Sequence, residues 1–140
     1  MLESCLRKQE EMIQLFSKCA SQEEKYEVII GLGRKAKGLA PEYKTSENLV
    51  KGCQSTMYLR SWSDDGKVYF QGESDALISA GLAELLLAVY SGETAEAILK
   101  CPPDYLETIG ISASLTPNRA NGLYSIHLRM KQEALKLLLV

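Results

Sequence analysis

The stretch from Ala76 to Tyr90 constrains the fold most, because it is apolar almost all the way round a helix. Its large apolar side chains are Leu77, Ile78, Leu82, Leu85, Leu86, Leu87 and Val89. A helix without a polar face is typical of the centre of a core. Ser74 can cap its N-terminus, and Asp75 adds a negative charge in the first turn, where exposed amides favour it. We therefore predict a central helix, around which the other elements must pack.

Further helices are predicted on both sides of this segment. Residues 2–18 carry apolar side chains at helical spacing. A capping box, Ser21-Gln22-Glu23-Glu24, starts a second helix that ends near Gly38. Short helices follow Thr94, and Thr116-Pro117 starts a long last helix with proline at its first position. The apolar face of that last helix consists of Leu123, Ile126, Met130, Ala134 and Leu137. Its opposite face carries Arg119, Arg129, Lys131 and Lys136, a pattern typical of a solvated surface.

Residues 57–63 and 67–72 alternate between two faces and flank the turn Asp64-Asp65-Gly66, which predicts an antiparallel hairpin. Two strands alone are marginally stable, so helices or a third strand must cover the apolar face. The segment Leu49-Val50 is a candidate for that third strand. We predict an α+β fold in which a small antiparallel sheet of about three strands packs against several helices.

Length and charge narrow the class of protein. A chain of 140 residues with 46% hydrophobic content is expected to form one domain, residues 1–140. The net charge is -2 and the basic residues are scattered, so nucleic acid is not expected as a partner. The N-terminus has no apolar signal region and no run is long enough to span a membrane, which predicts a cytoplasmic protein.

The four cysteines, Cys5, Cys19, Cys53 and Cys101, lie far apart, without a Cys-x-x-Cys metal pair or the density of a disulfide framework. Cys53 differs from the others in its neighbours. Gly52 permits unusual backbone geometry, Gln54 and Ser55 can hydrogen-bond a sulfur anion, and Lys51 adds a positive charge. This pattern is typical of a reactive thiol. The alternative is a small buried side chain, which is the role we assign to the other three cysteines.

Gly52-Cys53-Gln54-Ser55 resembles the corresponding stretch of the SufE family of sulfur-acceptor proteins, which serve iron-sulfur cluster assembly. Other matching stretches follow in the same order: Gly72-Glu73-Ser74-Asp75-Ala76, Gly81-Leu82, Leu85-Leu86, Tyr90-Ser91-Gly92, Leu115-Thr116-Pro117-Asn118-Arg119 and Gly122-Leu123. They cover most of the chain. One departure is Thr94-Ala95-Glu96, where the family commonly starts a helix with Thr-Pro.

The resemblance implies a function centred on Cys53. A separate, pyridoxal-phosphate-dependent cysteine desulfurase of the SufS type would hand its persulfide sulfur to Cys53 and be stimulated by this transfer. Cys53 would then pass the sulfur to an iron-sulfur scaffold of the SufBCD type. The chain would be a carrier and not an enzyme, with no cofactor or metal of its own and a fold shared with IscU. The resemblance leaves open whether the chain forms a homodimer. The supporting residues are Gly52, Gln54, Ser55, Asp75 and Arg119.

Three alternatives compete with this interpretation. An iron-sulfur scaffold would need about three thiolates at one site, so Cys19 or Cys101 would have to lie beside Cys53. A thiol peroxidase or similar redox protein would use Cys53 alone. For Arg119, the alternative is a surface ion pair with Asp75, which would contribute little. His127, the single histidine, is expected at the edge of the core or on the surface and not in a site.

Overall fold

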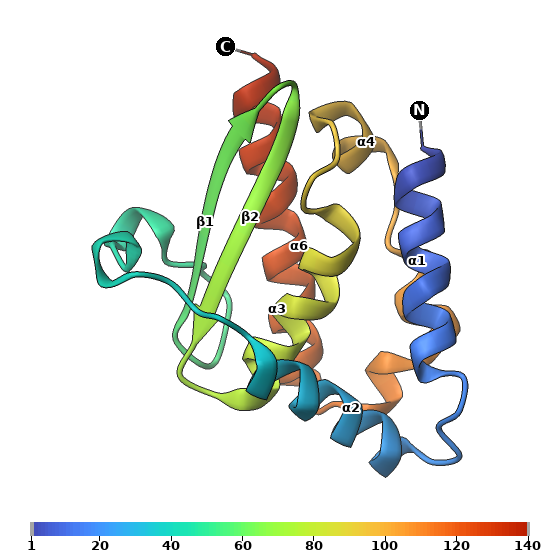
Figure 1. Ribbon diagram of the computed structural model, residues 1–140. Helices are drawn as coiled ribbons and strands as arrows, with labels where there is room; N and C mark the ends of the chain where they lie inside the picture. Colours follow the sequence, from blue (N-terminus) through green and yellow to red (C-terminus); the bar gives the residue numbers. More distant parts are fainter. Residues whose placement is uncertain (1, 140) are drawn as a thin grey trace.

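The computed structural model describes residues 2–139, apart from the side chain of Ser114. Six α-helices, two strands and three short 3-10 turns follow one another in these residues (Figure 1). The elements are α1 (Glu3–Phe16), α2 (Gln22–Lys35), η1 (Pro41–Tyr43), η2 (Ser46–Asn48), β1 (Met57–Asp64), β2 (Lys67–Ser74), α3 (Leu77–Tyr90), α4 (Ala95–Lys100), α5 (Asp104–Ile109), η3 (Ile111–Ser114) and α6 (Pro117–Leu138).

Helix α3 lies at the centre, as predicted, and packs against α1, α2, α6 and β2 (Figure 1). Ten of its residues are buried, and Leu85, Leu86 and Val89 have no exposed surface. The predicted Ser74 cap is wrong. Ser74 is the last residue of β2, and its hydroxyl accepts a hydrogen bond from the backbone N–H of Ala76 at 3.3 Å, one residue before the helix begins.

Helices α2 and α3 touch through their backbones at two glycines. A Cβ added at Gly81 would overlap the carbonyl oxygen of Ile29. A Cβ added at Gly33 would overlap the carbonyl oxygen of Leu77 in the same way. Neither helix can accept a side chain there without moving away, so these glycines set the distance between the two helices.

We predict that Gly81→Ala lowers the free energy of unfolding by about 1–3 kcal/mol, because the new methyl group forces α2 off α3. Denaturant unfolding measures the change. Gly31→Ala is the matched control, since a Cβ at Gly31 meets nothing within 4 Å. The control should gain stability from helix propensity, and a loss as large as that at Gly81 would contradict the packing explanation.

The predicted hairpin is confirmed, with Met57 opposite Ser74 and Asp64 opposite Lys67. Asp65 and Gly66 form its turn, both at positive φ, as a two-residue hairpin turn requires. One face, Met57, Leu59, Val68 and Phe70, is buried against the helices. The sheet has two strands and not about three: the Leu49-Val50 segment makes a single bridge, Leu49 to Tyr58, before the chain turns away.

The outer face of the hairpin holds the segment that leads toward Cys53. The Arg60 guanidinium lies 3.7 Å from the ring centroid of Tyr43 and 4.4 Å from that of Trp62. Trp62 in turn stacks on Tyr69, with centroids 5.7 Å apart. A guanidinium between two aromatic rings is attracted by both, so this stack ties η1 to the sheet.

Cys5 and Cys101 are buried between α1 and the α4–α5 corner, as predicted for small core side chains. Burial raises the pKa of the Cys5 thiol well above its usual range, and the neighbouring Cys101 adds to this effect. The amide of Gln9 donates to the sulfur of Cys101 at 3.3 Å and to the carbonyl of Pro102 at 2.9 Å. These contacts fix α1 to the corner, well away from the hairpin.

His127, on α6, is more deeply buried than predicted, with 8% of its surface exposed. Its ring lies against Tyr90, with centroids 5.1 Å apart, and its Nε2 finds no hydrogen-bond partner in the described part of the chain. Burial, helped by the charge of Lys131, lowers the pKa of His127 from 6.5 to about 4. The ring is therefore neutral in the folded protein at neutral pH.

We predict that His127→Leu makes the protein less sensitive to acid. Between pH 6.5 and 4 the unfolded chain binds a proton on His127 that the folded chain refuses, so the wild type loses stability as the pH falls. This loss is roughly 1–3 kcal/mol. Unfolding free energies at pH 7 and pH 4.5 measure it. A difference between variant and wild type that stays constant with pH would contradict the assignment.

Candidate functional site

Cys53 lies between η2 and β1, on a loop whose N-terminal arm includes η2. Both arms of this loop are held by hydrogen bonds. In the N-terminal arm, residues 46–51, the N–H of Val50 donates to the carbonyl of Met57 at 2.8 Å. At the tip, Gly52 has φ +89, and a Cβ there would lie 2.5 Å from the Ser125 hydroxyl. Glycine is therefore required at Gly52 both by the backbone angle and by the close approach to α6.

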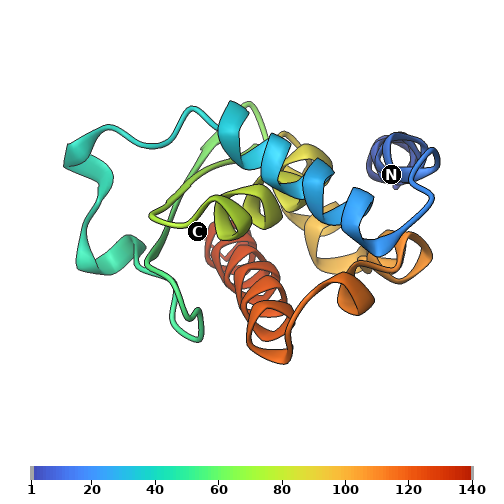
Figure 2. The same ribbon diagram turned by 90° about the horizontal axis from the view of Figure 1, so that it is seen from below.

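The loop runs along one side of α6. Residues 119, 122, 125 and 129 are three or four positions apart, so they share a face of the helix. Their loop partners, taken in that order, are Ser55, Cys53, Gly52 and the carbonyls of Leu49 and Glu47. The loop and the helix thus run in opposite directions. Figure 2 shows the segment between α2 and β1, which includes this loop, projecting to one side of the packed helices.

The thiol of Cys53 is half-buried against the first turns of α6. Its Sγ lies 3.8 Å from the carbonyl oxygen of Gly122. A Cβ at Gly122 would contact Sγ at 3.9 Å. Beside the thiol is a hollow of about 10 Å³, lined by Cys53, Gln54, Ser79, Leu82, Asn118, Arg119, Gly122 and Ile126. A space of this size holds about one water-sized group.

Arg119 is the cation of this site. Its Nη1 donates to the hydroxyls of Ser55 and Ser79, both at 2.6 Å. Ser79 is buried on α3, so the guanidinium is fixed between the core helix and the loop. Burial raises the pKa of the Cys53 thiol above its ordinary value, and the Arg119 charge opposes this rise without cancelling it. Cys53 is therefore a protonated thiol at neutral pH in this conformation of the loop.

Asp75 has a role different from both of those considered from the sequence. Its Oδ1 accepts from the N–H of Thr56 at 3.1 Å, and its own N–H donates to the carbonyl of Thr56 at 3.3 Å. Asp75 therefore braces the C-terminal end of the loop. Arg119, for which an ion pair with Asp75 was the alternative, donates to the two serines instead.

The structure also brings in residues that the sequence did not indicate. Ser79 and Leu82 come from α3, and Ile126 comes from α6. A signal for Ser79 existed, because Ser79 and Glu84 are the two polar residues in an otherwise apolar helix.

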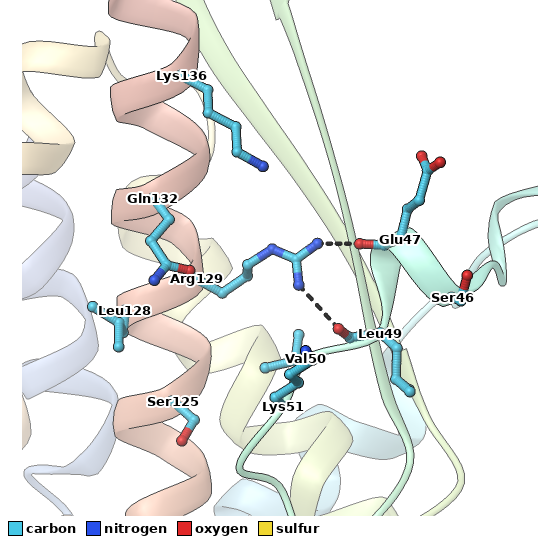
Figure 3. Close-up of a pocket in the computed structure, with 10 residues that line it drawn as sticks. All are labelled: Ser46, Glu47, Leu49, Val50, Lys51, Ser125, Leu128, Arg129, Gln132 and Lys136. Atoms are coloured by element: carbon cyan, nitrogen blue, oxygen red, sulfur yellow. Dashed lines mark hydrogen bonds between the residues drawn. The ribbon is translucent and has the colours of Figure 1, made fainter.

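A second, larger hollow lies between the N-terminal arm and α6 (Figure 3). This groove has a volume of about 460 Å³. It is lined by Ser46, Glu47, Leu49, Val50, Lys51, Ser125, Leu128, Arg129, Gln132 and Lys136. Lys51, expected to stabilise the Cys53 anion, lines this groove, whereas Arg119 supplies the charge that acts on the thiol. Arg129, expected on a solvated face, spans the groove to reach the loop.

Within residues 2–139, no three His, Cys, Asp or Glu side chains converge as a metal site would require. Over the same described residues, no helix has the length and apolar character needed to cross a membrane.

Fold and site together describe a small α+β protein that holds one half-buried cysteine beside an arginine. The chain belongs to the SufE family: the family described as "Fe-S metabolism associated domain" matches residues 10–134. This membership associates the chain with iron-sulfur metabolism.

Relatives agree with this assignment. An uncharacterized SufE-like protein of Synechocystis is 36% identical over 124 residues, which cover 89% of this chain and 78% of the relative. An uncharacterized SufE-like protein of Rhizobium meliloti is 38% identical, covering 80% and 84%. SufE-like protein 1 of Arabidopsis thaliana, named chloroplastic/mitochondrial, is 34% identical over 93% of this chain, which spans only 35% of that longer protein.

A solved structure shares the fold. The solution structure of a hypothetical protein from Thermus thermophilus superimposes with a TM-score of 0.78 at 25% identity. The match covers 95% of this chain and 97% of the other, so the arrangement of helices around the hairpin extends over both proteins.

We predict that Arg119→Met raises the pKa of Cys53 further, because the opposing positive charge is lost while burial remains. The rate of Cys53 alkylation, measured against pH, should show its midpoint at a higher pH than in the wild type. Ser55→Ala is the control: it removes one hydrogen bond of Arg119 but keeps the charge. An equal upward shift in both variants would contradict an electrostatic role for Arg119.

Proposed function

We propose that this chain is a sulfur acceptor, which takes persulfide sulfur from a cysteine desulfurase onto Cys53 and passes it to an iron-sulfur cluster scaffold. The observation that carries the proposal is the placement of Cys53, half-buried on a glycine-containing loop with Arg119 beside it. Such a placement suits a thiol that must shelter its sulfur and also present it to another protein. Membership of a family associated with iron-sulfur metabolism supports the same role.

The chemistry of acceptance is an exchange at sulfur. The Cys53 thiolate attacks the terminal sulfur of the donor persulfide, and a new S–S bond forms at Cys53 while the donor's S–S bond breaks. The donor cysteine leaves as a thiolate with the bonding electron pair, so no oxidant or reductant is consumed. In the second transfer, a nucleophile of the scaffold takes the terminal sulfur and Cys53 leaves as the thiolate.

The closed loop provides the resting state of this cycle. Burial keeps Cys53 protonated, and only the thiolate attacks, so the free protein reacts slowly with oxidants and stray electrophiles. Outward movement at Gly52 would return Cys53 to water and lower its pKa toward the ordinary value. We propose that docking of the desulfurase favours this open state. The small hollow could shelter a single added sulfur atom when the loop closes again.

The remaining parts of the proposal concern partners and compartment. The desulfurase, a pyridoxal-phosphate enzyme of the SufS type, and the scaffold, of the SufBCD type, are separate chains. This chain serves as a carrier that stimulates the desulfurase. It works as one domain and needs no cofactor of its own. The mass of the protein in solution tests whether it forms a homodimer. A reducing compartment such as the cytoplasm fits four free cysteines, while the Arabidopsis relative is named for organelles.

The scaffold alternative can be tested directly. A cluster needs about three thiolates at one site, with Cys19 or Cys101 beside Cys53. Cys101 is buried beside Cys5 instead, and no three His, Cys, Asp or Glu side chains of the described residues converge. Anaerobic reconstitution with iron and sulfide should therefore give no cluster bound through Cys53. The redox alternative predicts rapid peroxide turnover with a thiol reductant and no response to a desulfurase, both of which can be measured.

We predict that Cys53→Ser reduces sulfur acceptance to background, because a hydroxyl cannot act as the sulfur nucleophile at neutral pH. The measurement is transfer of radiolabelled sulfur from a desulfurase loaded with labelled cysteine. Cys19→Ser is the matched control, since Cys19 is also partly exposed but lies in the connection between α1 and α2. Transfer that survives Cys53→Ser and disappears with Cys19→Ser, in folded proteins, would move the site elsewhere.

A further inference from the structure

We propose that Arg129 is a positioning residue for Cys53: it fixes the N-terminal arm of the loop on α6 and thereby holds the thiol in its closed position. The consequence for sulfur transfer rests on the proposed function, but the positioning role itself does not. Arg129 lies on α6 about three turns beyond Arg119, on the same face.

The contacts of Arg129 reach two backbone carbonyls of the same arm. Nη1 donates to the carbonyl of Leu49 at 3.0 Å, and Nη2 donates to the carbonyl of Glu47. Figure 3 shows the guanidinium crossing the groove to both oxygens, while the Glu47 carboxylate points away from it. Arg129 therefore binds the backbone of the arm and does not form an ion pair with the Glu47 carboxylate. Hydrogen bonds from a charged donor are the stronger kind.

Glu133 fixes the guanidinium for this task. Nε of Arg129 donates to Oε1 of Glu133 at 2.9 Å, one turn further along α6. The two side chains are 17% and 16% exposed, so both are largely shielded from water. The same planar group thus faces its helix through Nε and the loop through both terminal nitrogens. This fork geometry is one that a lysine cannot reproduce.

The geometry links Arg129 to the thiol through the loop's register on α6. The carbonyl gripped at Leu49 is three residues before Gly52, whose carbonyl accepts from Ser125 at a long 3.5 Å. Cys53, the next residue, contacts Gly122. Of these contacts along the N-terminal arm and tip, those of Arg129 are the charge-assisted ones. Without them, the arm would keep its Val50–Met57 hydrogen bond to β1, but arm and tip would be held on α6 only by the long contacts of Gly52 and Cys53.

The experiment compares Arg129→Met with the wild type by Cys53 alkylation and by backbone hydrogen exchange. Arg129→Met keeps the aliphatic stem and removes all three donors. We expect alkylation at pH 7.5 to rise about tenfold, since one hydrogen bond from a charged donor is worth about that factor. The midpoint of the alkylation profile should also move to lower pH, toward an exposed thiol. Hydrogen exchange should become faster at residues 47–55 and stay unchanged in α3.

Two companion variants make the test specific. Arg129→Lys, which retains one donor group, should give intermediate rates. Glu47→Gln removes the neighbouring carboxylate while leaving its backbone carbonyl in place, and it should behave as wild type. An effect of Glu47→Gln equal to that of Arg129→Met would overturn the proposal, because it would reveal an ion pair.

Two other results would also overturn it: unchanged alkylation and exchange in Arg129→Met, or faster exchange spread over the whole chain with a lowered melting temperature. Sulfur transfer is scored separately from these measurements. If the loop opens in Arg129→Met but wild-type Cys53 never accepts sulfur from a desulfurase, the proposed function fails and the positioning role stands. If Cys53 accepts sulfur but the loop is unchanged in Arg129→Met, the positioning role fails and the proposed function stands.

Discussion

The burial of most of α3 is the constraint on which the rest of the structure depends. Ten of its fourteen residues are buried, and α1, α2, α6 and β2 each cover part of the helix. The backbone contact at Gly81 and Gly33 brings α2 close, while α6 packs along another side. The site lies where the start of α3 meets the start of α6, so Ser79 and Leu82 from one helix face Arg119 and Gly122 from the other.

This position explains the electrostatic balance at Cys53. The apolar neighbours Leu82 and Ile126 make the thiolate unfavourable, and the single guanidinium of Arg119 only partly offsets this cost. A fully exposed cysteine would be more reactive at rest, and a fully buried one could not meet a partner. The half-buried thiol lies between these limits, which is the reason we propose that the position of the loop controls its reactivity.

Features with a local sequence pattern were predictable, and features set by distant contacts were not. The apolar helix, the hairpin and the N-caps at Ser21 and Thr116 follow from neighbouring residues, and the structure confirms them. Asp75 looked like a first-turn residue, yet it bonds Thr56, which is 19 positions away. Arg129 looked solvated, because nothing in its own helix indicates carbonyls of the loop. Such partners depend on how whole elements pack.

The arrangement of anchors also determines how the loop can move. Arg119 and Arg129 both belong to α6, whereas Asp75 lies between β2 and α3 and holds the loop end that continues into β1. If the loop leaves α6, the contacts with that helix and the Val50–Met57 hydrogen bond are lost together, while the Thr56–Asp75 contacts and the β1–β2 ladder need not change. The opening that we propose is therefore a swing of residues 47–55 about their C-terminal end, with Gly52 near the tip. Such a motion would expose Cys53 and leave α3 buried, so the core would stay folded while the site opens.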